Sequence, residues 1–478
     1  MRKGGADGTG RQVNEFVLTP ASVSSGKFGQ LWAASLDGSI WGQPLYMNGL
    51  TIGGKARNVV YVATNNDSVY AFDADTGTQL WKKSFLSTGV TAVAGSSLGI
   101  SSQTGILSTP VIDPVRQVIY VVSNTSENSA QSFPHRLHEL SLITGAEMSV
   151  SQVISHPNLQ VKMKFQRPGL LFANGMVYVG FGSIKDITPY HGILFAFDAV
   201  TLDQKAVFDV TPTGSQGGIW MSGAAPAADS GGNIYISTGN GSVSTNNFGE
   251  SIVKLSPMLQ ELDHFTPFDW YTLDYGPNGD GVKGDKDLGS GGLILVPDQN
   301  GQYPHEVIAC GKPNPIYVLN RDSLGGMGAS SDNILQRLPN QLGSSSPCFS
   351  TPAMWQQNLY FAANSDVLKM FVLNASTGML STAPASKGTF TYQWPGADPV
   401  VSSNGNSNGI VWTIDLGTTA SGGTVPPTLR AADATNVSKE LYVSPSLTSI
   451  VRWVPPTVVN GHVYLGASNR LVAFGMTP

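Results

Sequence analysis

A repeated pair of strands limits what this chain can fold into more than any other feature. The clearest copy is VVYVATNNDSVYAFDADTGTQLW, residues 59–81, which predicts two strands joined by a tight turn, then a second turn and a short strand ending in Trp81. The first strand recurs as VIYVVSN (118–124), MVYVGFG (176–182), NIYISTGN (233–240), EVIACGK (306–312), NLYFAANS (358–365), GIVWTIDL (409–416) and HVYLGASN (462–469). Eight copies of one supersecondary unit therefore share this chain.

The turn after the second strand of each unit recurs in the same order. Asp73 in the first copy is matched by Ser141, Asp198, Ser256, Asn320, Asn374 and Asp433. These short polar side chains bond their own turn backbone, and their spacing of about 60 residues leaves room for four strands and their loops. Helical periodicity is nearly absent. The pattern predicts an all-β fold, a single eight-bladed β-propeller of four-stranded antiparallel blades.

The two ends of the repeat predict how the ring closes. The last unit stops after LVAF (471–474) and lacks an outer strand, whereas FGQLWAASL (28–36) precedes the first complete unit. We expect this N-terminal strand to complete the last blade, because a closed ring leaves no free edge. The predicted domains are an N-terminal extension, residues 1–27, and the propeller, residues 28–478.

Composition excludes several classes of function. Charged residues make up 12% of the chain and the net charge is −5, without a basic block, so we expect no nucleic-acid partner. No apolar run is long enough to span a bilayer, and the N-terminus MRKGGADGTGRQ is not a signal peptide as it stands. The few lysines and many small polar residues favour an extracytoplasmic, monomeric protein. Cys310 and Cys348 are either two buried thiols or one bridge, which would indicate an oxidising compartment.

The segment AFDADTGTQLW (71–81) has the spacing A-x-D-x-x-T-G-x-x-x-W. It resembles the tryptophan-docking motif of the pyrroloquinoline-quinone (PQQ) repeat family. That family includes eight-bladed quinoprotein alcohol dehydrogenases and also cofactor-free propellers such as outer-membrane assembly scaffolds. Because one fold serves both, the resemblance implies the fold, and the function has to be argued from the site.

Two segments resemble the cofactor site of the dehydrogenases. GGIW (217–220) followed by TGN (238–240) is similar to the segment in which a Trp lies under the quinone and an Asn binds Ca²⁺, which implies these roles for Trp220 and Asn240. GKPNPIYVLNR (311–321) resembles the pattern whose Lys donates to the quinone oxygens, which implies that role for Lys312. The ordinary alternatives are a turn amide for Asn240, a core Trp, and a Lys paired with a carboxylate.

A third segment should hold the catalytic base. FTPFDWYTLDYGPNGDGVKGDKDLGSGG (265–292) lies where the dehydrogenases carry T-P-H-D-x-W-D, and TPFDW matches it in part without the His. The acid is Asp269 or, after an insertion, Asp287 or Asp285, of which we favour Asp287 because the next blade opens directly afterwards. The alternative is that these are solvated loop acids.

The same region offers a separate calcium motif. In GPNGDGVKGDKD (276–287), Asn278, Asp280, Gly281 and Asp287 fall at positions 3, 5, 6 and 12 of an EF-hand-like loop. The first position is Gly276, which has no carboxylate. Asp280 is therefore a candidate metal ligand.

A fourth group lies in the third unit. Arg167 in QRPGL precedes an innermost strand and is expected near the central axis as a cofactor contact or an inter-blade salt bridge. His191 in PYHG is a candidate for proton transfer or an ordinary loop His. Asp186 lies in the loop where the dehydrogenases carry a Glu that binds Ca²⁺, and it is a shorter substitute for that ligand.

The chain also departs from the dehydrogenase pattern. It has no adjacent Cys pair to cover a quinone and no C-x-x-C-H for a covalent haem, so we expect no haem. Three functions stay open. The first is PQQ- and Ca²⁺-dependent oxidation of an alcohol or sugar. The second is a cofactor-free propeller that binds a small molecule, glycan, peptide or protein in its funnel, and the third is a cofactor-free lyase or hydrolase that uses His191, Arg167 and nearby acids.

Overall fold

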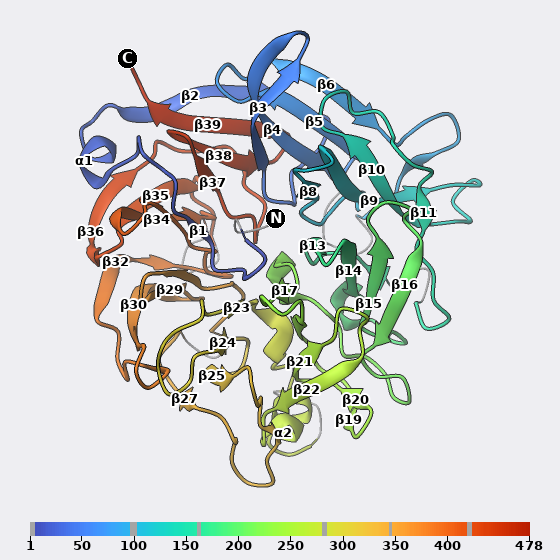
Figure 1. The fold of residues 1–478 in the computed structure, drawn as a ribbon, viewed down its shortest axis with the longest axis vertical. Coiled ribbons are helices and arrows are strands. Elements are labelled where there is room, and N and C mark those ends of the chain that lie inside the picture. The colour runs from blue at the N-terminus through green and yellow to red at the C-terminus, as the bar shows by residue number, and fades with distance from the viewer. Residues whose placement is uncertain (1–4, 96–102, 160–163, 280–283, 344–346, 418–422) are drawn as a thin grey trace.

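The computed structural model describes residues 5–95, 103–159, 164–279, 284–343, 347–417 and 423–478. Eight antiparallel β-sheets surround a central channel like the blades of a propeller (Figure 1). The predicted all-β, eight-bladed fold is confirmed. Each blade runs outward from an innermost strand that borders the channel.

The first four blades run in chain order from the innermost strand to the outermost. They are β3 (Leu45–Ile52), β4 (Lys55–Thr64), β5 (Ser68–Asp73) and β6 (Gln79–Ser84); β8 (Val111–Asp113), β9 (Val118–Ser126), β10 (His135–Ser141) and β11 (Gln152–Val153); β13 (Leu171–Ala173), β14 (Met176–Ser183), β15 (Ile193–Asp198) and β16 (Gln204–Asp209); and β17 (Ala227–Ala228), β18 (Ile234–Ser237), β21 (Ile252–Leu255) and β22 (Glu261–Thr266).

The other four blades follow in the same direction around the ring. They are β23 (Leu293–Leu295), β24 (Glu306–Ala309), β25 (Ile316–Asn320) and β27 (Gln336–Leu338); β28 (Ala353–Trp355), β29 (Asn358–Ala362), β30 (Asp366–Asn374) and β32 (Ser386–Tyr392); β33 (Val400–Asn404), β34 (Ser407–Asp415), β35 (Thr428–Asp433) and β36 (Asn436–Val443); and β37 (Thr457–Val459), β38 (His462–Ala467), β39 (Arg470–Met476) and β2 (Phe28–Ser35).

Short elements decorate the blades. Small strands are β7 (Thr91–Ala92), β12 (Lys164–Phe165), β19 (Val243–Ser244), β20 (Asn247–Phe248), β26 (Gly326–Met327) and β31 (Met379–Leu380). The helices are α1 (Pro20–Val23), α2 (Trp270–Tyr275) and the 3₁₀ turns η3 (Ile184–Asp186), η4 (Met221–Gly223) and η5 (Leu288–Ser290). Among the described residues, no helix is long and apolar enough to cross a membrane.

The ring closes through its N-terminal strand, as the sequence predicted. Strand β2 pairs antiparallel with β39, in a register that sets Phe28 opposite Met476 and Ser35 opposite Arg470. The outermost strand of blade 8 thus comes from the start of the chain, and the first and last segments lie side by side (Figure 1).

The tyrosine of each V-Y-V-like strand explains why this repeat holds a ring together. These side chains are buried in the second strand of their blade, and five of them donate a hydrogen bond to a backbone carbonyl of the next blade around the ring. The pairs are Tyr61 with Leu142, Tyr120 with Ala199, Tyr178 with Pro257, Tyr360 with Ala434 and Tyr464 with Ala74. The acceptors all lie in the turn after the third strand, which is the turn that the sequence marks with a short polar residue.

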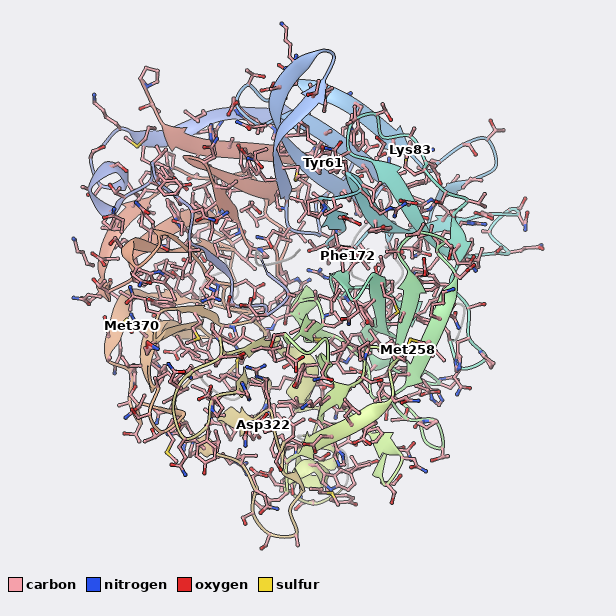
Figure 2. The ribbon with its side chains drawn as sticks, in the orientation of Figure 1. Tyr61, Lys83, Phe172, Met258, Asp322 and Met370 are labelled. Carbon is pink, nitrogen blue, oxygen red and sulfur yellow. A yellow bond between two sulfur atoms is a disulfide. The ribbon has the colours of Figure 1, made fainter. Side chains whose placement is uncertain are left out.

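The tryptophan of the motif docks on the same turn. The indole nitrogen of Trp81 donates to the carbonyl of Leu142 at 3.0 Å, and its ring lies against Gly145. A Cβ atom on Gly145 would lie 2.5 Å from that ring, and this glycine has φ of +70°. Trp32 of β2 repeats the contact on Gly77 of blade 1. The T-G turn therefore needs glycine both for its conformation and for the close approach of the ring. Side chains fill the spaces between neighbouring blades (Figure 2).

The segment predicted as an N-terminal extension is bonded to the innermost strands. The carbonyls of Ala6, Asp7, Thr9 and Gly10 accept backbone hydrogen bonds, and their donors are Ala228, Leu295, Met354 and Val401, one from each of blades 4 to 7. Strand β1 (Arg11–Gln12) then pairs parallel with β33. The segment satisfies inner edges that would otherwise be unpaired.

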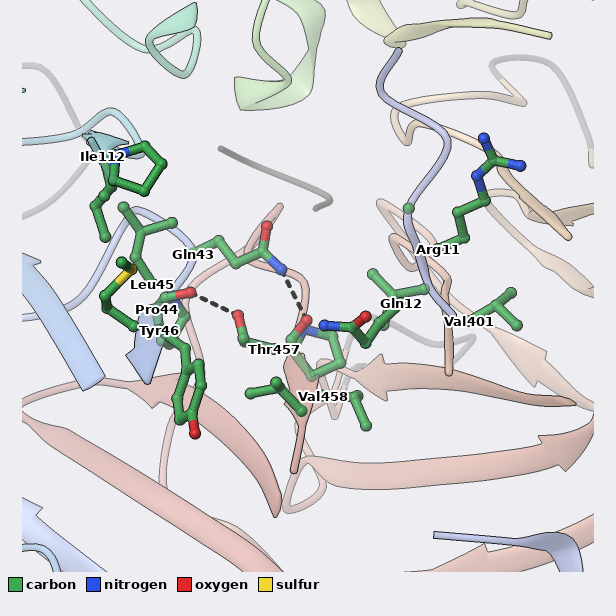
Figure 3. A pocket seen from close by; sticks show the side chains of 16 residues that line it. Arg11, Gln12, Gln43, Pro44, Leu45, Tyr46, Ile112, Val401, Thr457 and Val458 are labelled. Atoms are coloured by element: carbon green, nitrogen blue, oxygen red, sulfur yellow. Dashed lines mark hydrogen bonds between the residues drawn. The ribbon is translucent and has the colours of Figure 1, made fainter. Parts of the chain in front are cut away.

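The channel has a cavity at each end. One is lined by residues of the innermost strands of blades 1, 2, 7 and 8 or next to them, including Leu45, Ile112 and Val458, together with Arg11 and Gln12 of the N-terminal segment (Figure 3). The other, which we call the funnel, is lined by loops that precede innermost strands and by loops that follow second strands.

Candidate active site in the central funnel

The funnel holds a cavity of about 300 Å³. Its aromatic lining residues are Trp41, Phe165, Trp220, Phe349, Trp394 and Trp453. Its charged lining residues are Arg167, Lys185, Asp186, Asp287, Lys312 and Arg452. An aromatic cavity with a few convergent charges is the usual form of a small-molecule site. Five residues that the sequence singled out in separate segments thus share one cavity, namely Arg167, Asp186, Trp220, Asp287 and Lys312.

Trp220 lies at the junction of blades 3 and 4, and its ring packs against three glycines. It directly precedes η4, and its indole covers Gly182, Gly218 and Gly239. Cβ atoms at these positions would lie 2.9, 2.6 and 2.8 Å from the indole. Any larger residue would push the ring toward the cavity. The G-G-I-W and T-G-N motifs therefore set the height of this aromatic floor, and no hydrogen-bond partner for the buried indole nitrogen occurs among the described residues.

Three carboxylates meet beside this floor. Asp186, Asp285 and Asp287 each offer an oxygen, and these oxygens all lie within 4.8 Å of one another. Lys312, which follows β24, places its ammonium between Asp285 and Asp287, at 2.5 Å from Asp287 Oδ2. The other oxygen of Asp287 accepts from the backbone N–H of Asn240 at 2.8 Å. The candidate base Asp287 is thus bonded directly to Lys312 and to Asn240 of the T-G-N turn.

Crowding and burial change the proton affinity of this cluster. Burial, together with repulsion from Asp287, raises the pKa of Asp186 to about 6, and Tyr190 donates a hydrogen bond to this carboxylate. Burial and Asp287 also raise the pKa of Asp285. Burial lowers the pKa of Lys312, but attraction to Asp287 and Asp285 outweighs it and raises the pKa above its ordinary value. Lys312 is therefore a fixed positive charge that does not fully balance three acids.

Asn240 is more than a turn amide. Its side-chain nitrogen donates to Asp274 Oδ1 at 2.6 Å, and its own Oδ1 is buried without a hydrogen-bond partner among the described residues. Asp274 Oδ2 is also buried without a hydrogen-bond partner among the described residues, and burial raises the pKa of Asp274. Sequence reasoning missed Asp274, which lies on α2 in the loop FDWYTLDY. Unsatisfied buried oxygens beside a group of acids fit the donor set of a hard cation.

A second acid that the sequence did not reveal lies behind the cluster. Glu250 is fully buried, and its Oε2 accepts from the backbone N–H of Leu288 at 2.7 Å. Burial and repulsion from Asp287 raise its pKa well above the ordinary value. The only available signal was a carboxylate directly before an apolar strand in GESIVKL (249–255).

Arg167 lies near the axis, as expected, and its guanidinium bonds backbone carbonyls of neighbouring blades. Its guanidinium donates to the carbonyls of Leu107 at 3.0 Å and Trp453 at 3.2 Å, and it lies 5.6 Å from the centre of the Trp41 ring. Arg167 therefore joins loops of blades 2, 3 and 8 at the funnel wall.

Three other candidates lie elsewhere. His191 is not among the lining residues, and its Nδ1 lies 3.1 Å from Asp209 Oδ1 on β16. Asp269 pairs with Arg337 at 2.7 Å, away from the three-acid cluster. Asp280 falls outside the described residues, so its predicted role as a metal ligand stays a prediction.

The two cysteines form a disulfide, Cys310–Cys348, which decides between the two alternatives that the sequence left open. Cys310 follows β24 two residues before Lys312, and Cys348 precedes Phe349 of the cavity wall. The carbonyl of Cys348 accepts from Ser290 Oγ, which in turn accepts from the backbone N–H of Lys312. The disulfide joins blades 5 and 6 next to Lys312.

Comparisons with known proteins agree with this architecture. The sequence profile of the family described as outer membrane protein assembly factor BamB matches residues 27–251. No curated protein matches in a sequence comparison. Together with the repeat and with solved structures of similar fold, the profile confirms the predicted resemblance of this chain to the PQQ-repeat β-propellers.

Three solved structures show the range of its relatives by fold. Quinohemoprotein alcohol dehydrogenase from Comamonas testosteroni is 14% identical, with a TM-score of 0.66 over 97% of this chain and 79% of that one. A europium-containing methanol dehydrogenase is 12% identical, with a TM-score of 0.67 over 99% and 97%. BamB from Moraxella catarrhalis is 11% identical, with a TM-score of 0.55 over 94% and 99%. At these identities the likeness concerns the fold alone.

Proposed function

We propose that the funnel binds PQQ beside a metal cation and oxidises a hydroxyl group of an alcohol or sugar. One observation carries this proposal: an aromatic floor, a group of three carboxylates and a lysine line or adjoin a single cavity. Neither the floor nor the acid cluster alone would be specific, because cores contain tryptophans and loops contain acids. Their convergence gives a place for a flat ring and a place for a cation side by side.

The residues present fit both groups. The face of Trp220 can stack on a flat ring, and its height is fixed by the glycines beneath it. Asp186 and the unpartnered Oδ1 of Asn240 offer oxygens to a hard cation. Ca²⁺ is the first ion to test, and a lanthanide is the second, since one structure of similar fold contains europium.

The chain's own groups have distinct roles in this proposal. PQQ, when bound, would supply the hydride acceptor. Asp287 would accept the hydroxyl proton, because its side chain is only 3% exposed at the cavity and its Oδ2 contacts the ammonium of Lys312. Asp186 and Asn240 would hold the cation, and Trp220 would orient the ring. Asp285, whose side chain is 70% exposed, would steady Lys312 from the solvent side.

The experiment is reconstitution of the full chain with PQQ and either Ca²⁺ or La³⁺. Calorimetry should show PQQ binding that depends on the cation, and dye reduction should follow with a panel of alcohols and sugars. Asp287→Asn should abolish dye reduction while keeping PQQ binding, whereas the exposed Asp203→Asn should change neither. Absence of PQQ binding under both cation conditions would refute the proposal.

A second function has support in one feature, the aromatic rim. Trp41, Trp394, Trp453 and Phe349 line the cavity without belonging to the acid cluster, and indole faces bind sugar rings by stacking. A cofactor-free glycan-binding propeller would show glycan binding without PQQ, lost in Trp394→Ala. The lyase or hydrolase alternative has no comparable support, because its His191 faces Asp209 instead of the cavity residues.

We also propose an extracytoplasmic location and a monomer. The disulfide supports an oxidising compartment, because such bridges persist mainly outside the cytoplasm. Thiol labelling of the native chain should leave both cysteines unmodified, and light scattering should give the mass of one chain.

A further inference from the structure

The funnel wall across from the acids carries a positive charge that the proposed chemistry does not use. Arg452 precedes the innermost strand of blade 8, which lies opposite blade 4 in a ring of eight. Its guanidinium carbon lies 4.4 Å from the centre of the Trp394 ring and 5.3 Å from that of Trp453. Arg452 therefore lies against two adjoining indoles at the edge of the cavity.

This arginine has no acidic partner in the part of the chain that the structure describes. The ion pairs found there include Lys312 with Asp285 and Asp287, but none involves Arg452. Burial lowers the pKa of Arg452, which shows that its charge is partly removed from water without compensation. A half-buried cation next to a cavity leaves an open place for an anion.

Neighbouring donors point to the same conclusion. The indole nitrogens of Trp41 and Trp453 are buried, and both lack hydrogen-bond partners among the described residues. Both residues line the cavity together with Arg452. One wall thus combines a guanidinium with N–H donors that have nothing to donate to, whereas the opposite wall is acidic. A ligand that satisfies both walls carries a hydroxyl at one end and an anion at the other.

We propose that Arg452 binds a carboxylate of a ring-shaped ligand in the funnel, so that the substrate is an acidic sugar such as a uronate. The guanidinium matches a planar carboxylate through two parallel hydrogen bonds, and the two adjoining indoles hold the guanidinium in place. The oxidation of the ligand's hydroxyl group rests on the proposed function, whereas binding of the carboxylate by Arg452 does not. A carboxylate could come from the substrate or from PQQ, which also bears carboxylates, and binding measurements separate the two.

The test measures binding to the full chain by calorimetry in three separate titrations. Glucuronate and methyl glucoside are compared without PQQ or metal, and PQQ is titrated alone. The variants are Arg452→Gln, which removes the charge, and Arg452→Lys, which keeps the charge but loses the planar fork. Arg470→Gln, an exposed arginine of the same blade, is the matched control, and circular dichroism checks that each variant folds.

We expect glucuronate to bind better than methyl glucoside and to weaken about tenfold to a hundredfold in Arg452→Gln, with Arg452→Lys between. Methyl glucoside binding and the Arg470→Gln control should not change. If PQQ affinity falls and glucuronate does not bind, the carboxylate site exists but serves the cofactor. If the affinities of glucuronate and PQQ are unchanged in both Arg452 variants, the carboxylate site is refuted, whatever PQQ reconstitution shows for the proposed oxidation.

Discussion

Replacing Lys312 with Met tests whether this lysine is the counter-charge of the acid cluster. The ammonium contacts Asp285 and Asp287, and the side chains of Lys312 and Asp287 are only 16% and 3% exposed. Met keeps most of the volume and removes the charge. The variant leaves Asp287 buried near Asp186, and among the described residues the N–H of Asn240 is the hydrogen-bond donor that remains to it.

The expected loss is about 3 kcal/mol in the free energy of unfolding, the lower end of the range for a buried charge that loses its partner. The lower end applies because Asp287 keeps the hydrogen bond from the N–H of Asn240. Asp287→Asn combined with Lys312→Met should cost less than the sum of the single changes by about 2 kcal/mol. The exposed pair Lys205–Asp203, with side chains 39% and 63% exposed, supplies the control, and Lys205→Met should cost less than about 0.5 kcal/mol.

Urea unfolding followed by tryptophan fluorescence measures these differences. Added Ca²⁺ should stabilise Lys312→Met more than the unchanged chain, because the freed carboxylates then bind the ion without competition from the ammonium. A loss below about 1 kcal/mol for Lys312→Met, or additive single changes, would show that Lys312 does not balance this cluster.

Three further predictions concern stability. Burial raises the pKa of Asp67 to about 8 from 3.8, so the folded chain holds a proton there that the unfolded chain releases. This bound proton stabilises the folded chain fully below pH 3.8, and the stabilisation is lost as the pH rises toward 8. The melting temperature should therefore fall over this pH range, and the fall should be smaller in Asp67→Asn. Trp81→Ala should cost about 3–5 kcal/mol in urea unfolding, and Gly145→Ala should also destabilise, because its Cβ would meet that ring. Replacing Cys310 and Cys348 with Ser should cost up to about 4 kcal/mol by the same measurement, from the loop that the bridge closes, and an unchanged midpoint would contradict this.

The fold was predictable because most blades repeat the same local sequence features. The buried tyrosine, the polar turn and the T-G glycine are each visible in the sequence, and each makes a contact with the neighbouring blade. The closing role of residues 28–36 was predictable by elimination, since one blade lacked a strand. The bonding of residues 6–12 along the innermost strands was not, because backbone hydrogen bonds require no particular side chains.

The site was predictable on one side of the funnel only. Asp186, Trp220, Asp287 and Lys312 belong to motifs with a family resemblance, and the structure places them in one cavity. The opposite wall has no such motif. Arg452 stands in SIVRWVPP, where nothing marks it as a partner for distant residues. Only closure of the ring brings the last blades across from the fourth, so sequence spacing carried no information about that wall.

Because β2 pairs with β39, the last strand of the chain, the ring cannot close until synthesis is nearly complete. Phe28 leaves the ribosome long before Met476, its partner across the closing pair. At ordinary rates of synthesis, this strand waits on the order of half a minute with its edge open. During that time seven blades can form, but none of them offers the missing partner. An unpaired edge invites pairing with another chain, so the interval before β39 emerges is when newly made copies are most exposed to aggregation and most in need of a chaperone.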